Sequence, residues 1–134
     1  MKSRFVLAAL ALTVTTVVSS ALAEESLDGK AKVDATFDAK AGKATLVIHG
    51  DGDGVYVNQD FGLKCTARGK DGGRVDKSEL RKDDATYEAS DKPGKAKSAT
   101  LTVGADKGIE GECKLVVCTA TACSSPFKVS YASN

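Results

Sequence analysis

Apolar and polar residues alternate along most of the chain after residue 30. In residues 30–37 every second side chain is apolar, and the side chains between them carry charges or hydroxyl groups. A period of two is typical of a half-buried β-strand, because successive side chains of a strand point to opposite faces. The same pattern predicts strands at residues 30–37, 43–49, 55–58, 61–68, 98–103, 108–117 and 127–131, with 86–88 an edge strand or part of a loop. Residues 75–84 are charged and show only a weak helical pattern after Ser78.

Glycine-rich and aspartate-rich segments separate these runs, and composition agrees with many short strands. The chain has 13 glycines, 2 prolines and no tryptophan, and valine and threonine are frequent in the alternating runs. The final two runs, 108–117 and 127–131, are joined by a short stretch of small and polar residues. They therefore predict an antiparallel hairpin, and the chain as a whole predicts an all-β fold.

The first 23 residues have the pattern of a secretory signal peptide. Lys2 and Arg4 precede an apolar run at 5–18, and residues 21–23 have the small-residue pattern of a cleavage site. The run is shorter than the about 20 residues of a membrane-spanning helix, and no second such run follows. Cleavage after Ala23 would leave residues 24–134 as a single domain. We expect an exported chain without a membrane span, in the periplasm or the extracellular medium.

Charge and motif patterns exclude several function classes. Without the leader the chain has 17 basic and 18 acidic residues, a net charge of −1, and the two signs are interspersed. A nucleic-acid binder usually shows a basic patch or stripe instead. Asp51 and Asp53 match the start of a calcium loop, but Tyr56 stands where glycine is needed and Gly62 where glutamate is needed. His49 is the sole histidine, so no Ser-His-Asp or Cys-His arrangement is available. We expect no metal, no cofactor and no hydrolase.

Four cysteines allow three pairings. Cys65 and Cys113 fall on the apolar faces of their predicted strands, whereas Cys118 has the opposite parity. This favours Cys65–Cys113, joining two strands or two sheets, and leaves Cys118 for Cys123 across a short loop. The chain-entropy model gives the first bond roughly 4 kcal/mol and the second about half as much. The second bond is thus either a hairpin staple or a labile, exchange-active bond, since exposed disulfides are the more easily reduced ones.

In the segment 115–129, a predicted strand is followed by Cys118, Cys123 and Pro126 and then by another predicted strand. This segment resembles the end of the N-terminal periplasmic domain of DsbD-type thiol:disulfide interchange proteins. Residues 53–58 are similar to a glycine–aromatic strand of the same family. The resemblance implies an immunoglobulin-like antiparallel β-sandwich in which Cys118 and Cys123 alternate between dithiol and disulfide. It also implies electron transfer from a membrane partner to other exported proteins, with thioredoxin-fold or other exported thiol proteins as partners.

This chain departs from the family pattern in three ways. Ser124 and Ser125 stand between the second cysteine and the proline, and Cys65 and Cys113 are additions that we expect to form a structural disulfide. The family's aromatic cap loop has only Tyr87 as a candidate counterpart.

No charge lies within the loop at 119–122, and Lys114 and Lys128 are the nearest cations in sequence. These two lysines either face the cysteine pair across the hairpin or are solvated, which is the usual state of lysines on strands. Two hypotheses remain: a redox-exchange module, and an exported binding or scaffold domain in which both disulfides are structural.

Overall fold

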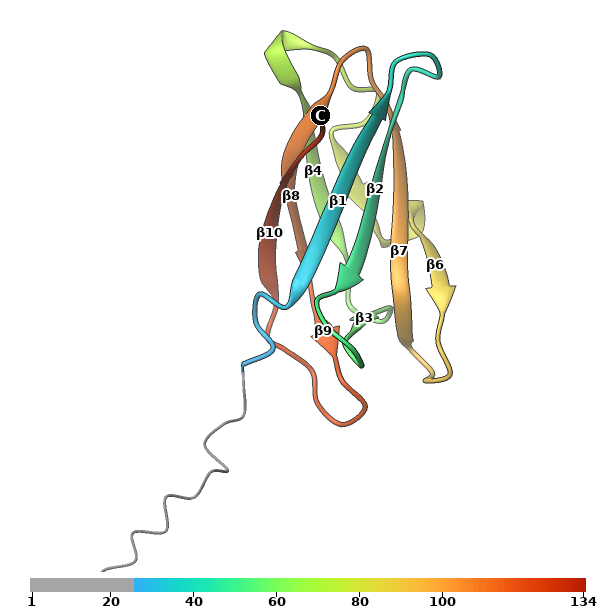
Figure 1. The fold of residues 1–134 in the computed structure, drawn as a ribbon, viewed down its shortest axis with the longest axis vertical. Coiled ribbons are helices and arrows are strands. Elements are labelled where there is room, and N and C mark those ends of the chain that lie inside the picture. The colour runs from blue at the N-terminus through green and yellow to red at the C-terminus, as the bar shows by residue number, and fades with distance from the viewer. Residues whose placement is uncertain (1–25) are drawn as a thin grey trace, which may run out of the picture.

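The computed structural model describes residues 26–134, which form two antiparallel β-sheets packed on one hydrophobic core (Figure 1). The predicted all-β sandwich is confirmed. The predicted signal peptide, residues 1–23, lies outside the described residues. The first sheet has the order β1-β2-β7-β3-β9, with β6 also paired to β7, and the second has the order β10-β8-β4-β5.

The strands follow the predicted alternation closely. Those of the first sheet are β1 (Ala31–Asp38), β2 (Lys43–Gly50), β3 (Tyr56–Asn58), β6 (Thr86–Ala89), β7 (Lys95–Gly104) and β9 (Val117–Cys118). Those of the second sheet are β4 (Lys64–Gly69), β5 (Glu79–Arg81), β8 (Ile109–Leu115) and β10 (Phe127–Ala132). The predicted antiparallel pairing of the last two runs is present, because Phe127 of β10 lies opposite Leu115 of β8, although β9 of the first sheet lies between them in the chain.

The inner faces of the two sheets supply the core. Leu46, Ile48 and Leu101 contribute from the first sheet, and Ile109 and Leu115 from the second, each at most 1% exposed. Burying one such side chain stabilises a fold by about 1.5–3 kcal/mol. Strands β1 and β10, which belong to different sheets, lie side by side at one edge of the sandwich (Figure 1).

A tyrosine ties three strands of the second sheet together. The Tyr131 hydroxyl on β10 donates a 2.7 Å hydrogen bond to the backbone oxygen of Thr66 on β4. Between them lies Gly111 of β8, paired with Tyr131, where a side chain would overlap both the Thr66 carbonyl and the Tyr131 hydroxyl. Burial raises the pKa of Tyr131 to about 12, with the charge of Arg68 acting in the opposite direction. Glycine is required here by close approach of neighbouring groups.

The prediction of one strand over 108–117 is wrong at its end. β8 stops at Leu115, and after Val116 the chain crosses to the first sheet to form β9. Leu115, Val116 and Val117 are all at most 5% exposed. A single strand would have turned Val116 to the outer face, whereas crossing between the sheets allows all three apolar residues to be buried. The backbone N–H of Asn58 in β3 already bonds to the Val116 carbonyl, at 3.0 Å.

The weak helical pattern after Ser78 does not correspond to an α-helix. The segment forms β5, followed by a short 3₁₀ turn at Lys82–Asp84. Leu80 is 1% exposed and pairs with Cys65 of β4, so strand pairing and burial override the local propensity. The predicted strand 61–68 likewise begins only at Lys64.

Candidate functional site

The disulfide Cys65–Cys113 lies inside the core. The two cysteines are directly opposite each other on the adjacent strands β4 and β8, with Cα atoms 4.0 Å apart, and both are fully buried. The predicted pairing is confirmed, and the bond joins two strands of one sheet. Neither sulfur is open to a thiol partner from solution.

The second disulfide, Cys118–Cys123, lies at the end of the sandwich where β9 leads into a loop (Figure 1). Its two halves have different environments. Cys118 is 1% exposed, whereas Cys123 is exposed. The expectation of an exposed bond therefore holds for one of its two cysteines. Access to this disulfide is from the Cys123 side.

Cys118 is buried without belonging to the core cluster. In β9 its neighbour Val117 packs in the core and pairs with Val57, so Cys118 points to the other face of the sheet, as the predicted parity requires. There it lies in register with Tyr56 of β3. The sequence thus places Cys118 outside the core, while the loop and neighbouring strands keep it from solvent.

Backbone and hydroxyl groups hold the loop between the cysteines in a tight turn. The Thr119 N–H donates to the Ala122 carbonyl at 2.7 Å, and the Ala122 N–H donates to the Thr119 hydroxyl oxygen at 3.2 Å. Threonine side chains commonly stabilise turns in this way. Beyond Cys123, Ser124 pairs with Val117 through its N–H at 2.8 Å and its side-chain oxygen at 3.1 Å. The loop conformation therefore does not depend on the disulfide alone.

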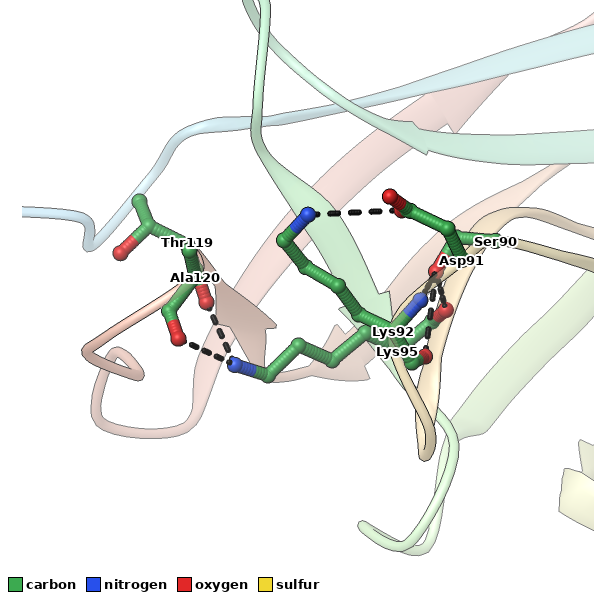
Figure 2. Close-up of polar contacts among 6 residues, drawn as sticks. All are labelled: Ser90, Asp91, Lys92, Lys95, Thr119 and Ala120. Atoms are coloured by element: carbon green, nitrogen blue, oxygen red, sulfur yellow. Dashed lines mark hydrogen bonds and ion pairs between the residues drawn. The ribbon is translucent and has the colours of Figure 1, made fainter.

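A lysine from β7 holds the same loop from the side. The Lys95 ammonium donates to the carbonyl of Thr119 at 2.6 Å and to that of Ala120 at 3.2 Å (Figure 2). Thr119 follows Cys118 directly, so a positive charge lies beside the backbone of the buried cysteine. Figure 2 also shows Lys92 beside Asp91. The Lys92 Nζ lies 5.4 Å from the centre of the Tyr56 ring. The hydrogen bond from Lys92 to Asp91 raises the pKa of Lys92, so its charge is kept at neutral pH.

The surroundings of Cys123 have the opposite charge. The Asp28 carboxylate accepts a 3.1 Å hydrogen bond from the backbone N–H of Ser125, two residues after Cys123. A depression of about 440 Å³ lies here, lined by Ser26, Leu27, Asp28, Thr119 and residues 121–125. The exposed cysteine thus borders a hollow that the Asp28 carboxylate also lines.

Two of the roles considered for residues near this site do not fit the structure. Lys114 and Lys128 do not face the cysteine pair, because they lie opposite each other on the outer face of the second sheet. Tyr87 lies in β6 and packs against the core. The aromatic residue beside Cys118 is Tyr56, in register with it on β3.

The other residues singled out in the sequence lie elsewhere. The His49 Nε2 donates a hydrogen bond to the carboxylate oxygen Oδ2 of Asp34, at 2.9 Å. Asp51 and Asp53 are exposed in the turn after β2, where Gly52 and Gly54 have positive φ angles of 116° and 72°. Within residues 26–134 no three His, Cys, Asp or Glu side chains are grouped as metal ligands.

No helix in the described part of the chain is long and apolar enough to cross a membrane. The two disulfides indicate an oxidising environment.

Comparisons with protein-family models, with curated proteins and with solved structures give no match to this chain.

Sequence reasoning missed three residues of the site: Lys95, Asp28 and Tyr56. Lys95 is 24 residues from Thr119, and Asp28 is 97 residues from Ser125. Only Tyr56 had a local signal, since it stands in an apolar run predicted to be a strand. Lys95 reaches the loop through the pairing of β7 with β3, and Asp28, which precedes β1, through the packing of β1 beside β10; local spacing reveals neither.

Proposed function

We propose that this protein is an exported thiol:disulfide exchange module that acts through Cys118 and Cys123. The DsbD-like pattern of residues 115–129 motivates the proposal, and its partners would be thioredoxin-fold or other exported thiol proteins. Export to the periplasm or the extracellular medium would follow from the leader at residues 1–23. An oxidising compartment is where such a pair has disulfide chemistry to perform.

The observation that carries this proposal is the asymmetry of the Cys118–Cys123 bond. Cys123 is exposed beside a depression, whereas Cys118 is buried. The positive charge of Lys95 lies beside the Cys118 backbone, and the negative charge of Asp28 lies near Cys123. A neighbouring cation lowers the pKa of a thiol and a neighbouring anion raises it. Burial of Cys118 raises the pKa of its thiol and so acts against the Lys95 charge. In the proposed exchange Cys123 is the sulfur open to attack, and Cys118 is the leaving group, with Lys95 stabilising its thiolate.

The exchange would proceed in two steps. A partner thiolate attacks the Cys123 sulfur, the Cys118–Cys123 bond breaks, and Cys118 leaves as a thiolate while a mixed disulfide forms with the partner. A second thiolate of the partner then attacks the partner's own sulfur and releases Cys123. The partner dithiol is oxidised to a disulfide and this protein's disulfide is reduced to a dithiol, with two electrons transferred. The reverse sequence reduces the disulfide of another exported protein.

A binding or scaffold domain with two structural disulfides is the second candidate. The observation that favours it is the hydrogen-bonded turn between Thr119 and Ala122, which Lys95 and Ser124 hold in place. In such a domain the disulfide would serve only to fix a turn that is already held by hydrogen bonds. In that case the depression beside Cys123 would receive a binding partner and no electrons would pass.

The reduction potential of each disulfide separates the two candidates. The oxidised protein is equilibrated with glutathione buffers, free thiols are trapped, and peptides are assigned by mass spectrometry, with Cys65–Cys113 as the internal reference. A Cys118–Cys123 potential above about −230 mV with a resistant Cys65–Cys113 bond supports exchange. A Cys118–Cys123 potential below about −300 mV marks a structural bond and rejects the redox role.

The role given to Lys95 has its own test. Replacing a cation near a thiolate by a neutral group destabilises the reduced form, so Lys95→Gln should lower the Cys118–Cys123 potential and raise the pKa of the Cys118 thiol. The matched control is Lys97→Gln. Lys97 lies on the same strand and is exposed, and among the described residues it makes no hydrogen bond to the loop. Equal potentials in wild type and both variants would show that Lys95 only holds the turn.

A further inference from the structure

Four cations form a single row across the outer face of the second sheet. Strand pairing places Lys128 of β10 opposite Lys114 of β8, Lys114 opposite Lys64 of β4, and Lys64 opposite Arg81 of β5. All four side chains are exposed. Neighbouring strands lie about 4.8 Å apart, so the row spans roughly 14 Å from its first to its last residue.

Like charges directly opposite each other destabilise a sheet. Other rows avoid this arrangement. In the second sheet, Arg68 lies opposite Glu110 with 3.8 Å between the charged groups. In the first sheet, one outer row mixes both signs with neutral residues: Lys32, His49, Ser98 and Glu88. The four-cation row is therefore an unfavourable arrangement that an anionic ligand would relieve.

Carboxylates neutralise this row only in part. Glu112 lies 3.6 Å from Lys128, and Glu79 lies 3.8 Å from Lys64 and 2.6 Å from the Nε of Arg81. Four cations against two carboxylates leave a local excess of two positive charges. Lys114, at the centre, has no ion-pair partner among the residues that the structure describes.

The surface is hollowed where the excess charge lies. A depression of about 240 Å³ is lined by Lys64, Lys114, Lys128, Thr66 and Glu112. A concave site lined by one sign of charge concentrates the field and attracts counter-ions. No aromatic residue lines the depression, so it offers no surface on which a nucleic-acid base could stack.

We propose that this depression, the sheet-face cation row, binds a ligand that carries linked phosphate groups. Three lysines line it, and lysine binds phosphate oxygens as a compact point charge with three donors. Phosphate groups bridging neighbouring lysines would occupy the space over Lys114. The site lies on β8, β4 and β10, away from the loop at 119–122, so the proposal does not depend on the redox role of the cysteines.

Titration of the purified oxidised protein with sodium triphosphate, followed by backbone amide NMR, tests the site. We expect shifts concentrated at Lys64, Lys114, Lys128 and their strand neighbours, and binding that weakens as salt is added. Lys114→Gln should weaken triphosphate binding about fivefold. Lys97→Gln removes the same charge from an exposed strand position of the other sheet, and should change the affinity less than about twofold.

A second probe, a lipid vesicle, identifies the source of the phosphate. Vesicles containing cardiolipin, whose headgroup links two phosphates, indicate a lipid ligand if they bind the protein and are displaced by triphosphate. Triphosphate binding without vesicle binding indicates a soluble ligand. The proposal is overturned if neither probe binds, or if Lys97→Gln weakens binding as much as Lys114→Gln. It is also overturned if a tri-glutamate peptide binds as tightly as triphosphate, because the site would then recognise charge without preference for phosphate.

Discussion

Removing each disulfide in turn should have very different effects on the free energy of unfolding. The variants are Cys65→Ala with Cys113→Ala, and Cys118→Ala with Cys123→Ala. In the chain-entropy model the stabilisation grows with the length of chain that the bond encloses. The sequence separations are 48 and 5 residues. These lengths correspond to about 4 kcal/mol for the core bond and about 2 kcal/mol for the loop bond.

Burial of a cysteine increases the loss of stability expected on its replacement by alanine. Cys65 and Cys113 are fully buried, so alanine at both positions also leaves unfilled volume in the core. The loss there should exceed about 4 kcal/mol, a large part of the 5–15 kcal/mol typical of a domain. In the loop pair only Cys118 is buried, Cys123 is exposed and the turn keeps its own hydrogen bonds, so the loss should stay near about 2 kcal/mol and well below that of the core pair.

Urea unfolding monitored by far-ultraviolet circular dichroism measures both losses, since the chain has no tryptophan to report by fluorescence. The comparison uses free energies of unfolding extrapolated to water, because an uncrosslinked denatured chain exposes more surface and has a larger m-value. The reasoning is refuted if the loop variant loses as much stability as the core variant. That result would make Cys118–Cys123 a principal support of the fold and would weaken the case for its exchange role.

Three further predictions concern the packing of single residues, each checked by urea unfolding. Gly111→Ala should lose about 3 kcal/mol, because the new methyl group overlaps the Thr66 carbonyl; a loss under about 1 kcal/mol would contradict that close contact. Tyr131→Phe should lose about 1 kcal/mol with its hydrogen bond. Since burial raises the pKa of Tyr131 from 10.0 to about 12, its ionisation favours the unfolded chain, so wild-type stability should fall as pH rises from 10 towards 12. Tyr131→Phe should reduce that fall, and an unchanged pH profile would contradict the assignment. Tyr87→Phe should leave stability unchanged or raise it, since the buried Tyr87 hydroxyl has no hydrogen-bond partner among the described residues; a loss above about 1 kcal/mol would reveal a partner.

The strand pattern and the cysteine pairing could be read from the sequence because both rest on local alternation. The parity of Cys65, Cys113 and Cys118 within their apolar runs was enough to favour the two bonds that the structure contains. A period of two is a property of the extended backbone itself, so it survives whatever the strand later pairs with. The same rule failed at Val116, where three consecutive apolar residues required burial and the chain changed sheets.

Only the tertiary structure decided what surrounds the cysteines and which charges share a face. Lys95 reaches the loop because β7 pairs with β3, and Asp28 reaches Ser125 from the opposite end of the chain. The cation row exists because three strand pairings bring Lys128, Lys114, Lys64 and Arg81 into one register. The sequence determined which face of its strand each side chain occupies, since that follows from backbone geometry alone. Register between distant strands depends on the packing of the whole core, so the neighbours of each side chain could be known only from the folded chain.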